Sequence, residues 1–350
     1  MRFFSFVQID YVKFNRGWNL HLRIFYMKFL VTGGLGFIGH NVVRLLETSG
    51  HQVAVLDNKT TYGVIPQAEL DYLMLERLCK IQTRDITLAS IEQPFDDSIL
   101  DGVDTVIHLA SFPRQKVVNA NPQWGSRSMS EGLLNLLELS VKHRVRKFVY
   151  ISSSMVYGNF KDSYFDGVDE SHECNPIGQY GIMKLAGEWL VKDYARRTGL
   201  TYTILRPSAV YGPLDVEDRV VSRFLLTAMR GETIQVNGPK ETLDFTYVGD
   251  VTDGITNAAL SDNTDNMTYN ITRGTARTLL EAAELAVKIV GKGSIQVNER
   301  DNNFPSRGQL NINRACSDFG FMPAINIEEG FEEYFDWLEH SLYWAKKTVQ

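Results

Sequence analysis

A glycine-rich stretch near the start of the chain constrains the fold more than any other feature. Residues 27–39 read MKFLVTGGLGFIG, in which Lys28 to Thr32 is a short apolar run typical of a strand. Three glycines follow at three-residue spacing, Gly33, Gly36 and Gly39, and residues 41–47 have a helical pattern. Glycine permits a tight turn close to a ligand, and a helix N-terminus adds free N–H groups and a partial positive charge. Strand, turn and helix together predict a cradle for a phosphate or pyrophosphate.

A second apolar strand identifies the ligand more closely. Residues 51–57, HQVAVLD, end in Asp57 about 20 residues beyond the glycine loop, where a carboxylate typically binds the adenosine ribose of a dinucleotide. A carboxylate there would repel the extra phosphate of NADP, so the sequence favours NAD. The alternative is that Asp57 is an ordinary acid at a strand end, and the nearby basic residues Lys59 and Arg84 leave NADP open.

The composition indicates a globular protein and argues against several classes. With 350 residues the chain can form one large domain or two, and it is 44% hydrophobic and 22% charged. No apolar run has the length of a membrane span, and a net charge of −6 gives no basic surface for nucleic acid. Three widely spaced cysteines, Cys79, Cys174 and Cys316, suit reduced thiols better than a disulfide framework. We expect a cytoplasmic protein without a metal site.

Residues 1–26 precede the glycine loop and are rich in aromatic and basic side chains. They lack the sustained apolar segment and the small-residue cleavage site of a signal peptide. We expect them to lie outside the fold, with Met27 as the true start of the protein.

Strand-like and helix-like segments alternate through the first part of the chain. Further strand-like runs occupy residues 79–86, 104–111, 147–153 and 201–207, and helical patterns lie between them. Apolar strands separated by helices predict an α/β protein with a Rossmann-type, doubly wound parallel sheet. We expect an NAD-binding domain over 27–207 and a smaller C-terminal, mainly substrate-binding lobe over 208–350. Segments near 240–270 are expected to return to the first domain.

The pattern Tyr-x-x-x-Lys, a known hydride-transfer pair, occurs three times. The three occurrences are Tyr157–Lys161, Tyr180–Lys184 and Tyr343–Lys347. Tyr180 opens the helical pattern YGIMKLAGEWLVKDY, which places Lys184 one turn further along the same face. Tyr157 leads through a glycine into a polar loop, and Tyr343 lies at the end of the chain. The sequence therefore predicts Tyr180 and Lys184 as the catalytic pair.

Such a pair works by changing the proton affinity of the tyrosine. A free tyrosine has a pKa of about 10 and is a poor base at neutral pH, whereas a nearby ammonium and a positive nicotinamide ring favour the phenolate. A hydroxyl within ISSSMVYG, residues 151–158, can hydrogen-bond the same substrate oxygen. Ser153 is the first candidate and Ser154 the second. The alternative for both serines is a polar strand end.

Seven motifs in one order resemble a known family. They are the glycine loop, RDI (84–86), HLAS (108–111), ISSSMVYG (151–158), YGIMK (180–184), LRPSAVYGP (205–213) and DFTYVGD (244–250). In this order the chain resembles the extended short-chain dehydrogenase/reductases, and within them the nucleotide-sugar epimerase/dehydratase family of the UDP-glucose 4-epimerase kind. The resemblance runs from about Met27 to a helix ending near residue 345.

The resemblance implies roles for individual residues. Tyr180 would be the base, Lys184 would hold the tyrosine and the nicotinamide ribose, and Ser153 would polarise the reacting hydroxyl. The expected cofactor-binding residues are Gly33, Gly36, Phe37, Ile38, Gly39, Asp57, Asn58, Asp85, Ile86, Leu109, Ala110, Ser111, Tyr180, Lys184 and Pro207.

Departures from the family pattern indicate the reaction. Dehydratases of the family carry Asp–Glu within the serine motif, where this chain has Ser154 and Met155. Methionine cannot exchange a proton, so 4,6-dehydration and glutamate-assisted decarboxylation lose their machinery. The family's 3,5-epimerases need a cysteine after the fourth strand, and SFPRQK (111–116) has none. C4 epimerisation through a transient 4-keto sugar remains the simplest expectation. A C4 dehydrogenase that releases its ketosugar and a non-catalytic NAD(P)-sensing protein are the alternatives.

The expected substrate is a nucleotide-diphosphate sugar. Its phosphates need local cations, and the candidates are Arg219, Arg223 and Arg307, the last within SRGQLNINRA (306–315), which resembles the family's C-terminal arginine segment. Three positions depart from residues frequent in the family, Met129, Ala209 and Leu243, so the base and the sugar stay open. Amphipathic helices around 129–143 and 181–198 predict a homodimer, because such helices pair across a two-fold axis in this family.

Overall fold

The structure, a computed structural model, describes most of the chain. The described residues are 8–14, 17–23, 26–60, 66–83, 85–111, 115–160, 167–215, 219–302, 304–341 and 344. Within them, no helix is long and apolar enough to cross a membrane.

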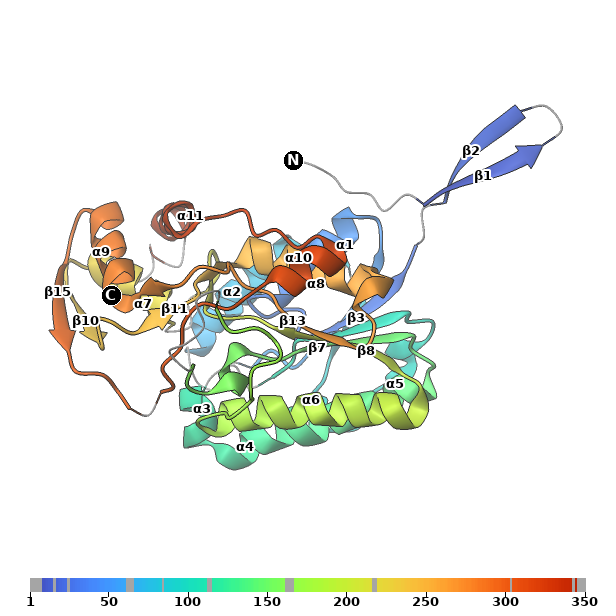
Figure 1. The fold of residues 1–350 in the computed structure, drawn as a ribbon, viewed down its shortest axis with the longest axis horizontal. Helices are drawn as coiled ribbons and strands as arrows, with labels where there is room; N and C mark the ends of the chain where they lie inside the picture. Colours follow the sequence, from blue (N-terminus) through green and yellow to red (C-terminus); the bar gives the residue numbers. More distant parts are fainter. Residues whose placement is uncertain are drawn as a thin grey trace.

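A seven-stranded parallel sheet forms the centre of the molecule (Figure 1). Its strands, in spatial order, are β13 (Met267–Asn270), β8 (Thr201–Arg206), β7 (Lys147–Ile151), β6 (Thr105–His108), β3 (Lys28–Thr32), β4 (Gln52–Asp57) and β5 (Ile86–Leu88). The six strands from β8 to β5 follow the order of the Rossmann fold, and the direction in which successive strands are added to the sheet reverses between β3 and β6. The predicted fold class is therefore confirmed.

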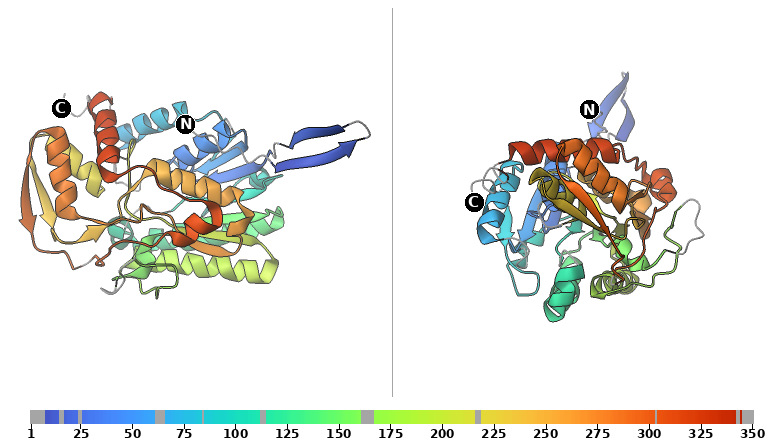
Figure 2. Two further views of the ribbon diagram at one scale, coloured as in Figure 1. Left: turned by 45° about the horizontal axis from the view of Figure 1, so that its top comes forward. Right: turned by 90° about the vertical axis from the view of Figure 1, so that its left-hand side faces the viewer.

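Helices cover both faces of the sheet, which explains why its strands are continuous apolar runs (Figures 1 and 2). One face is covered by α1 (Gly39–Thr48), α2 (Gln67–Cys79) and α8 (Val248–Leu260), and the other by α5 (Gly132–Lys142) and α6 (Gln179–Thr198). Both α8 and β13 come late in the chain, so the segment 248–270 packs with the Rossmann strands and helices.

Helix α6 lies unusually close to the sheet because of two glycines. A Cβ at Gly187 would lie 2.2 Å from the hydroxyl oxygen of Tyr150 on β7, and a Cβ at Gly181 would lie 2.6 Å from the Met155 carbonyl oxygen. Neither position can hold a larger residue unless the helix or the group that it contacts shifts. This close approach sets the position of the start of α6, which carries Tyr180 and Lys184.

The C-terminal lobe is built from small two-stranded sheets and helices. Its strands are β9 (Val210–Tyr211), β10 (Thr233–Asn237), β11 (Thr242–Leu243), β12 (Thr246–Tyr247), β14 (Arg277–Thr278) and β15 (Ser294–Asn298), and its helices are α7 (Val220–Met229), α9 (Leu279–Val290) and α11 (Ile327–His340). The buried Asp244 carboxylate ties three of its segments together, because it accepts hydrogen bonds from Thr272 Oγ1 (2.9 Å), Leu310 N (3.1 Å) and Gly274 N (3.2 Å). The chain just after Leu310 lies beside the edge strand β13, because Asn270 Nδ2 donates to Asn311 O at 3.0 Å.

One strand prediction was wrong. The run 79–86 is not a strand: Cys79 ends α2, and only Ile86–Leu88 pairs, with β4. The reason is a side chain from α1. The Glu47 carboxylate accepts the backbone N–H groups of Gln82 (2.7 Å) and Thr83 (2.5 Å), so these groups have a partner outside the sheet.

Strands β1 (Gln8–Phe14) and β2 (Gly17–Arg23) form an antiparallel hairpin that pairs with no other described strand. In Figures 1 and 2 the hairpin projects away from the body of the molecule. That residues 1–26 are dispensable for folding stays a prediction.

Candidate active site

A cavity of about 900 Å³ lies at the carboxyl edge of the large sheet, between the sheet and the C-terminal lobe. Ligands of doubly wound α/β folds bind at this edge. The cavity is lined from the glycine loop, across the start of α6, to the 300–307 segment of the lobe. One continuous space can therefore hold a dinucleotide and a second ligand side by side.

The glycine loop fits a pyrophosphate closely. Gly33 has a positive φ of 69°, and its N–H donates to Leu56 O at 2.8 Å. A Cβ there would lie 2.8 Å from Ala110 N, and a Cβ at Gly39 would lie 2.0 Å from Gly33 O. Only glycine fits at these two positions, and the backbone of the loop is open to the cavity in front of α1.

Asp57 ends β4 and is held with both carboxylate oxygens in fixed positions. Oδ2 accepts from Leu35 N at 3.0 Å, and Oδ1 accepts from Lys59 N at 2.7 Å. Burial raises the pKa of this carboxyl, and these two N–H groups and the charge of Arg77 oppose the rise. Each oxygen keeps acceptor capacity for the two hydroxyls of a ribose. Asp57 and Asn58 both line the cavity, as an adenosine subsite requires; Arg84 lies outside the described residues.

Tyr180 and Lys184 lie one turn apart at the start of α6, and both line the cavity. Lys184 Nζ is 5.9 Å from the centre of the Tyr180 ring and 5.3 Å from that of Tyr150. It donates to Ile151 O, at the end of β7, at 2.8 Å. Burial lowers the pKa of Lys184 to about 7, against the opposing effect of the Glu188 carboxylate.

Ser153 is placed to share a ligand with Tyr180. It precedes a 3₁₀ turn, η3 (Ser154–Tyr157), and its Oγ accepts from Met155 N at 3.2 Å. Burial raises the pKa of Tyr180, whereas the charge of Arg219, hydrogen bonding with Ser153 and the charge of Arg307 lower it. The sequence predicts that Lys184 supplies the positive charge that lowers the pKa of Tyr180. In the structure, the positive charges that lower this pKa are those of Arg219 and Arg307. An oxidised nicotinamide nearby would act in the same direction.

Ser154 differs from Ser153. Its side chain is fully buried, it does not line the cavity, and its Oγ has no hydrogen-bond partner among the described residues. Ser153 is therefore the serine that can contact a ligand. Met155, by contrast, lines the cavity with an apolar side chain that cannot exchange a proton.

All three predicted arginines line the cavity. The Arg219 guanidinium lies 5.3 Å from the centre of the Phe37 ring in the glycine loop and 3.6 Å from Asp215. Burial lowers the pKa of Arg307 to about 10, and its Nε has no hydrogen-bond partner among the described residues. Arg307 is half-buried and lines the cavity, so its guanidinium is suited to bind an anion there.

The structure places most predicted cofactor residues together but separates two. Gly33, Gly36, Phe37, Ile38, Gly39, Leu109, Ala110, Ser111 and Pro207 line the cavity. Asp85 and Ile86 do not: Asp85 is exposed, and its carbonyl accepts from Val55 N at 2.8 Å. The apolar wall in that region comes instead from Met74, Ala89 and Ile91, which the sequence pattern did not single out.

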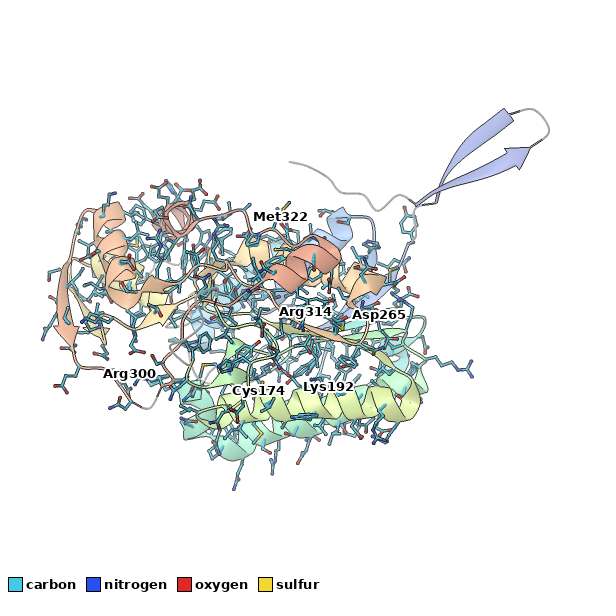
Figure 3. All side chains as sticks on the ribbon, viewed as in Figure 1. Cys174, Lys192, Asp265, Arg300, Arg314 and Met322 are labelled. Atoms are coloured by element: carbon cyan, nitrogen blue, oxygen red, sulfur yellow. The ribbon has the colours of Figure 1, made fainter. Side chains whose placement is uncertain are left out.

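Other lining residues also lack a signal in the sequence. Gln115, Lys116 and Asn119 come from α3 (Gln115–Ala120), and Arg300 pairs with Glu241 across the lobe at 3.0 Å. Figure 3 shows Arg300 on the side of the lobe that faces the first domain. Polar residues on short helices and loops have no periodicity, so only the folded arrangement identifies them.

Of the other two Tyr-x-x-x-Lys pairs, the structure describes only Tyr157. Tyr157 is fully buried, and its hydroxyl is used in hydrogen bonds with Arg206 and Asn270. Lys161, Tyr343 and Lys347 lie outside the described residues. Among the residues that are described, no cluster of histidine, cysteine or acidic side chains could hold a metal ion.

A Rossmann sheet with this strand order, a glycine loop after its first strand and a tyrosine–lysine pair facing the same cavity defines a short-chain dehydrogenase/reductase of the extended type. The model of the NAD dependent epimerase/dehydratase family matches residues 29–272. The chain belongs to this family, and NAD is its cofactor.

Relatives in the family differ in the reaction named for them. A putative UDP-glucose 4-epimerase of Methanocaldococcus jannaschii is 30% identical over 321 residues, which are 89% of this chain and 98% of the relative. UDP-glucuronic acid decarboxylase 3 of Arabidopsis thaliana is also 30% identical, over 87% of this chain and 86% of its own. Among solved structures, the chain resembles UDP-glucuronic acid 4-epimerase from Bacillus cereus in complex with UDP-glucuronic acid and NAD. The two chains are 26% identical with a TM-score of 0.81, and the match covers 89% of this chain and 99% of the other. The chain is thus an NAD-dependent enzyme of the nucleotide-sugar epimerase/dehydratase kind.

Proposed function

We propose that this enzyme is a nucleotide-sugar 4-epimerase. The observation that carries the proposal is the neighbourhood of Tyr180: Ser153 is the polar partner of its hydroxyl, and the residue two positions further along, Met155, lines the cavity with an apolar side chain. The site therefore has groups for moving one proton at one carbon. It lacks, at Met155, the acid or base that removal of water or of carbon dioxide needs in this family.

The reaction begins and ends at the C4 hydroxyl of the sugar. Tyr180, as phenolate, takes the hydroxyl proton, while Ser153 donates a hydrogen bond to the same oxygen and the charges of Arg219 and Arg307 favour the phenolate. NAD, held by the glycine loop and Asp57, would supply the acceptor and donor of the C4 hydride. The 4-keto sugar turns about its phosphate linkage, and Tyr180 gives the proton back to the oxygen after the hydride reaches the other face. Atoms and electrons are unchanged overall, as an isomerase requires.

The substrate we propose is a nucleoside-diphosphate sugar. Arg307, with its unused donor, and Arg219 lie on the cavity wall where a diphosphate beside Tyr180 would place its charge. UDP-sugars are the first candidates, because two family members that resemble this chain are named for UDP-glucose and UDP-glucuronic acid.

We also propose that the enzyme acts as a cytoplasmic homodimer. Trp189 and Ile182 on α6 and Trp124 on α4 (Pro122–Ser126) are 65%, 48% and 57% exposed, which is unusual for side chains of this size. Pairing of α6 helices across a two-fold axis would cover them. Three free cysteines agree with a reducing compartment.

The test is a panel of UDP-, dTDP-, GDP- and CDP-sugars incubated with the NAD-loaded enzyme, with products identified by NMR. Inversion at C4 without net formation of NADH supports the epimerase. Stoichiometric NADH with a released ketosugar would instead identify the dehydrogenase. Tight NAD binding with no change in any sugar would favour a sensor protein.

A further inference from the structure

A fully buried ion pair lies directly behind the candidate active site. Glu188 is on α6, one turn after Lys184, and Arg206 is the last residue of β8. Arg206 Nε donates to Glu188 Oε1 at 2.8 Å and Nη2 donates to Oε2 at 2.6 Å, which is the bidentate geometry that gives a strong, directional pair. Ser152 Oγ donates to Oε1 at 2.6 Å. One carboxylate therefore binds three segments of the chain at a single point.

Each of these segments carries a candidate site residue next to the contact. Ser152 precedes Ser153, Arg206 precedes Pro207, and Glu188 is on the helix that begins with Tyr180 and Lys184. A shift of the carboxylate would move the hydroxyl, the cofactor wall and the base relative to one another. An active site loses much of its rate when its groups move by about 1 Å.

The polar contacts continue from this pair toward the C-terminal lobe. Arg206 Nη1 donates to the Tyr157 hydroxyl at 2.9 Å, and that hydroxyl donates to Asn270 Oδ1 at 2.7 Å. Asn270 Nδ2 then donates to Asn311 O at 3.0 Å, in the segment that carries Arg307. The same network that holds α6 thus reaches the strand of chain that supplies an anion-binding arginine.

The charges around Lys184 give Glu188 a second effect. The groups facing Lys184 Nζ are Tyr180 and Glu188 from α6, Tyr150 from β7 and His108 from β6. Burial raises the pKa of Tyr150 far above its ordinary value and lowers that of His108 to about 3, so both are neutral. Burial raises the pKa of Tyr180 as well, so without NAD the negative charge that acts on Lys184 is that of Glu188. The bonds of Glu188 to Arg206 and Ser152 keep its oxygens from pairing with the ammonium directly.

We propose that Glu188 and Arg206 are positioning residues. Their ion pair fixes Ser153, Pro207 and the start of α6 relative to one another. It also holds a negative charge near Lys184 and takes up none of the hydrogen-bond donors of Lys184. The proposal rests on the assignment of Tyr180 and Lys184 to proton transfer. Cofactor binding depends on the charge of Lys184 as well, so the proposal can be tested with NAD alone.

The test is the pH dependence of NAD affinity, measured by calorimetry on Glu188→Gln. Without the carboxylate charge, Lys184 should lose its proton at lower pH, and the pH above which NAD affinity falls should move down by about one unit. Glu188→Asp keeps the charge but shortens the side chain; it should leave that pH near its wild-type value while turnover falls about tenfold or more. Asp265→Asn is the matched control, since it removes the carboxylate from another buried lysine, Lys147, at the far end of the sheet (Figure 3).

Glu188→Gln leaves Arg206 buried without its counter-ion and can fail to fold. The double variant Glu188→Met/Arg206→Met removes both charges, and the same downward shift is expected in it. An unchanged pH dependence of NAD affinity in Glu188→Gln, or in the double variant where the single one does not fold, would overturn the proposal. A wild-type protein that binds NAD with the expected pH dependence but epimerises no sugar would instead count against the proposed function.

Discussion

A buried lysine lies at each end of strand β7: Lys147 is its first residue, and Lys184 of α6 contacts its last residue, Ile151. The two ammonium groups are held in opposite ways. Lys147 begins the strand, and its Nζ contacts Asp265 Oδ1 (2.7 Å), Ser261 O (2.6 Å) and Thr264 Oγ1 (2.7 Å). The ammonium of Lys184 lies at the other end and makes one hydrogen bond among the described residues, to Ile151 O. An ammonium has three N–H donors; Lys147 makes two hydrogen bonds and an ion pair with Asp265, whereas Lys184 has two donors that a ligand can use.

The comparison distinguishes a lysine that is buried to stabilise the fold from a lysine that is buried beside a ligand site. A carboxylate in direct contact opposes the effect of burial on Lys147. At Lys184 the carboxylate is one helical turn away and already bonded to Arg206, and burial lowers the pKa to about 7. An incompletely satisfied cation beside a cavity is unfavourable for folding but useful for holding a hydroxyl-rich cofactor next to a phenol.

The largest expected effect tests the chemistry at the Lys184 end. Tyr180→Phe removes one oxygen from the proposed base and should lower turnover about 10²- to 10⁴-fold, with NAD affinity kept because the glycine loop and Asp57 are untouched. Tyr157→Phe is the control. It removes the hydroxyl that accepts from Arg206 Nη1 and donates to Asn270 Oδ1, so it should lower the free energy of unfolding by about 1–3 kcal/mol with a much smaller change in rate. Steady-state kinetics and urea unfolding distinguish the two; near-normal turnover in Tyr180→Phe would refute the mechanism.

Replacing each lysine by methionine should change stability in opposite directions. Lys147→Met removes three satisfied contacts and should lower the free energy of unfolding by about 2–4 kcal/mol. Lys184→Met relieves the cost of burying a poorly satisfied charge and should raise that free energy at neutral pH by about 1–3 kcal/mol, although NAD binding and turnover are lost. Urea unfolding of both variants without NAD checks this, and a loss of stability in Lys184→Met would break the comparison.

The pH dependence of stability should show the same difference. The pKa of Lys184 falls from an ordinary value of 10.5 to about 7 in the folded protein, so between these values the unfolded chain binds more protons than the folded one. Stability from this group therefore rises as the pH increases from about 7, and below that pH the full cost of the buried charge is present. Subtracting the curve for Lys184→Met from that of the wild type, measured from neutral pH to about pH 9, should reveal this slope. A flat difference would mean that Lys184 keeps an ordinary pKa.

The sequence predicted the sheet well because both of its faces are buried. Strands such as β3 and β4 are continuous apolar runs, and such runs are readable without knowing their neighbours. The run 79–86 failed because its backbone N–H groups bond to Glu47, a residue 35 positions away from Gln82. A long-range partner of this kind leaves no local pattern.

The candidate site was predictable where a single sequence motif gives both the place of a residue in the fold and its chemical type. Tyr180 and Lys184 are tied by helical spacing, and Asp57 by its distance from the glycine loop. Glu188 and Arg206 were not predicted, because the carboxylate and the guanidinium meet only after α6 has packed on β8. Asp85 does not line the cavity although the pattern predicted a cofactor contact for it: its carbonyl bonds to β4, and the residue is exposed.

A smaller effect is expected from the packing of α6. Gly187→Ala would place a methyl group 2.2 Å from the Tyr150 hydroxyl, so α6 or the ring must shift at a cost of about 1–3 kcal/mol. Gly330→Ala is a matched control on α11, where the added Cβ would lie 2.2 Å from the Tyr211 hydroxyl. Both variants should lose similar stability by thermal unfolding. Only Gly187→Ala should change the pH at which NAD affinity falls, since Tyr150 lies against Lys184.

The smallest effect concerns Ala209, which lines the cavity with a φ of 38°. Positive φ costs a residue with a Cβ about 1–2 kcal/mol, whereas glycine adopts it freely but loses more entropy on folding. Ala209→Gly should therefore raise the free energy of unfolding by about 0.5–1 kcal/mol, whereas Ala68→Gly on the exposed side of α2 should lower it by a similar amount.

Retained strain beside a cavity indicates that the backbone there is shaped for the ligand. If so, Ala209→Gly should gain stability while its KM for the sugar rises, and Ala209→Asn, which tolerates positive φ and adds an amide to the cavity, should change which sugars are accepted. Equal stability of Ala209→Gly and the wild type would mean that no strain is stored at this position.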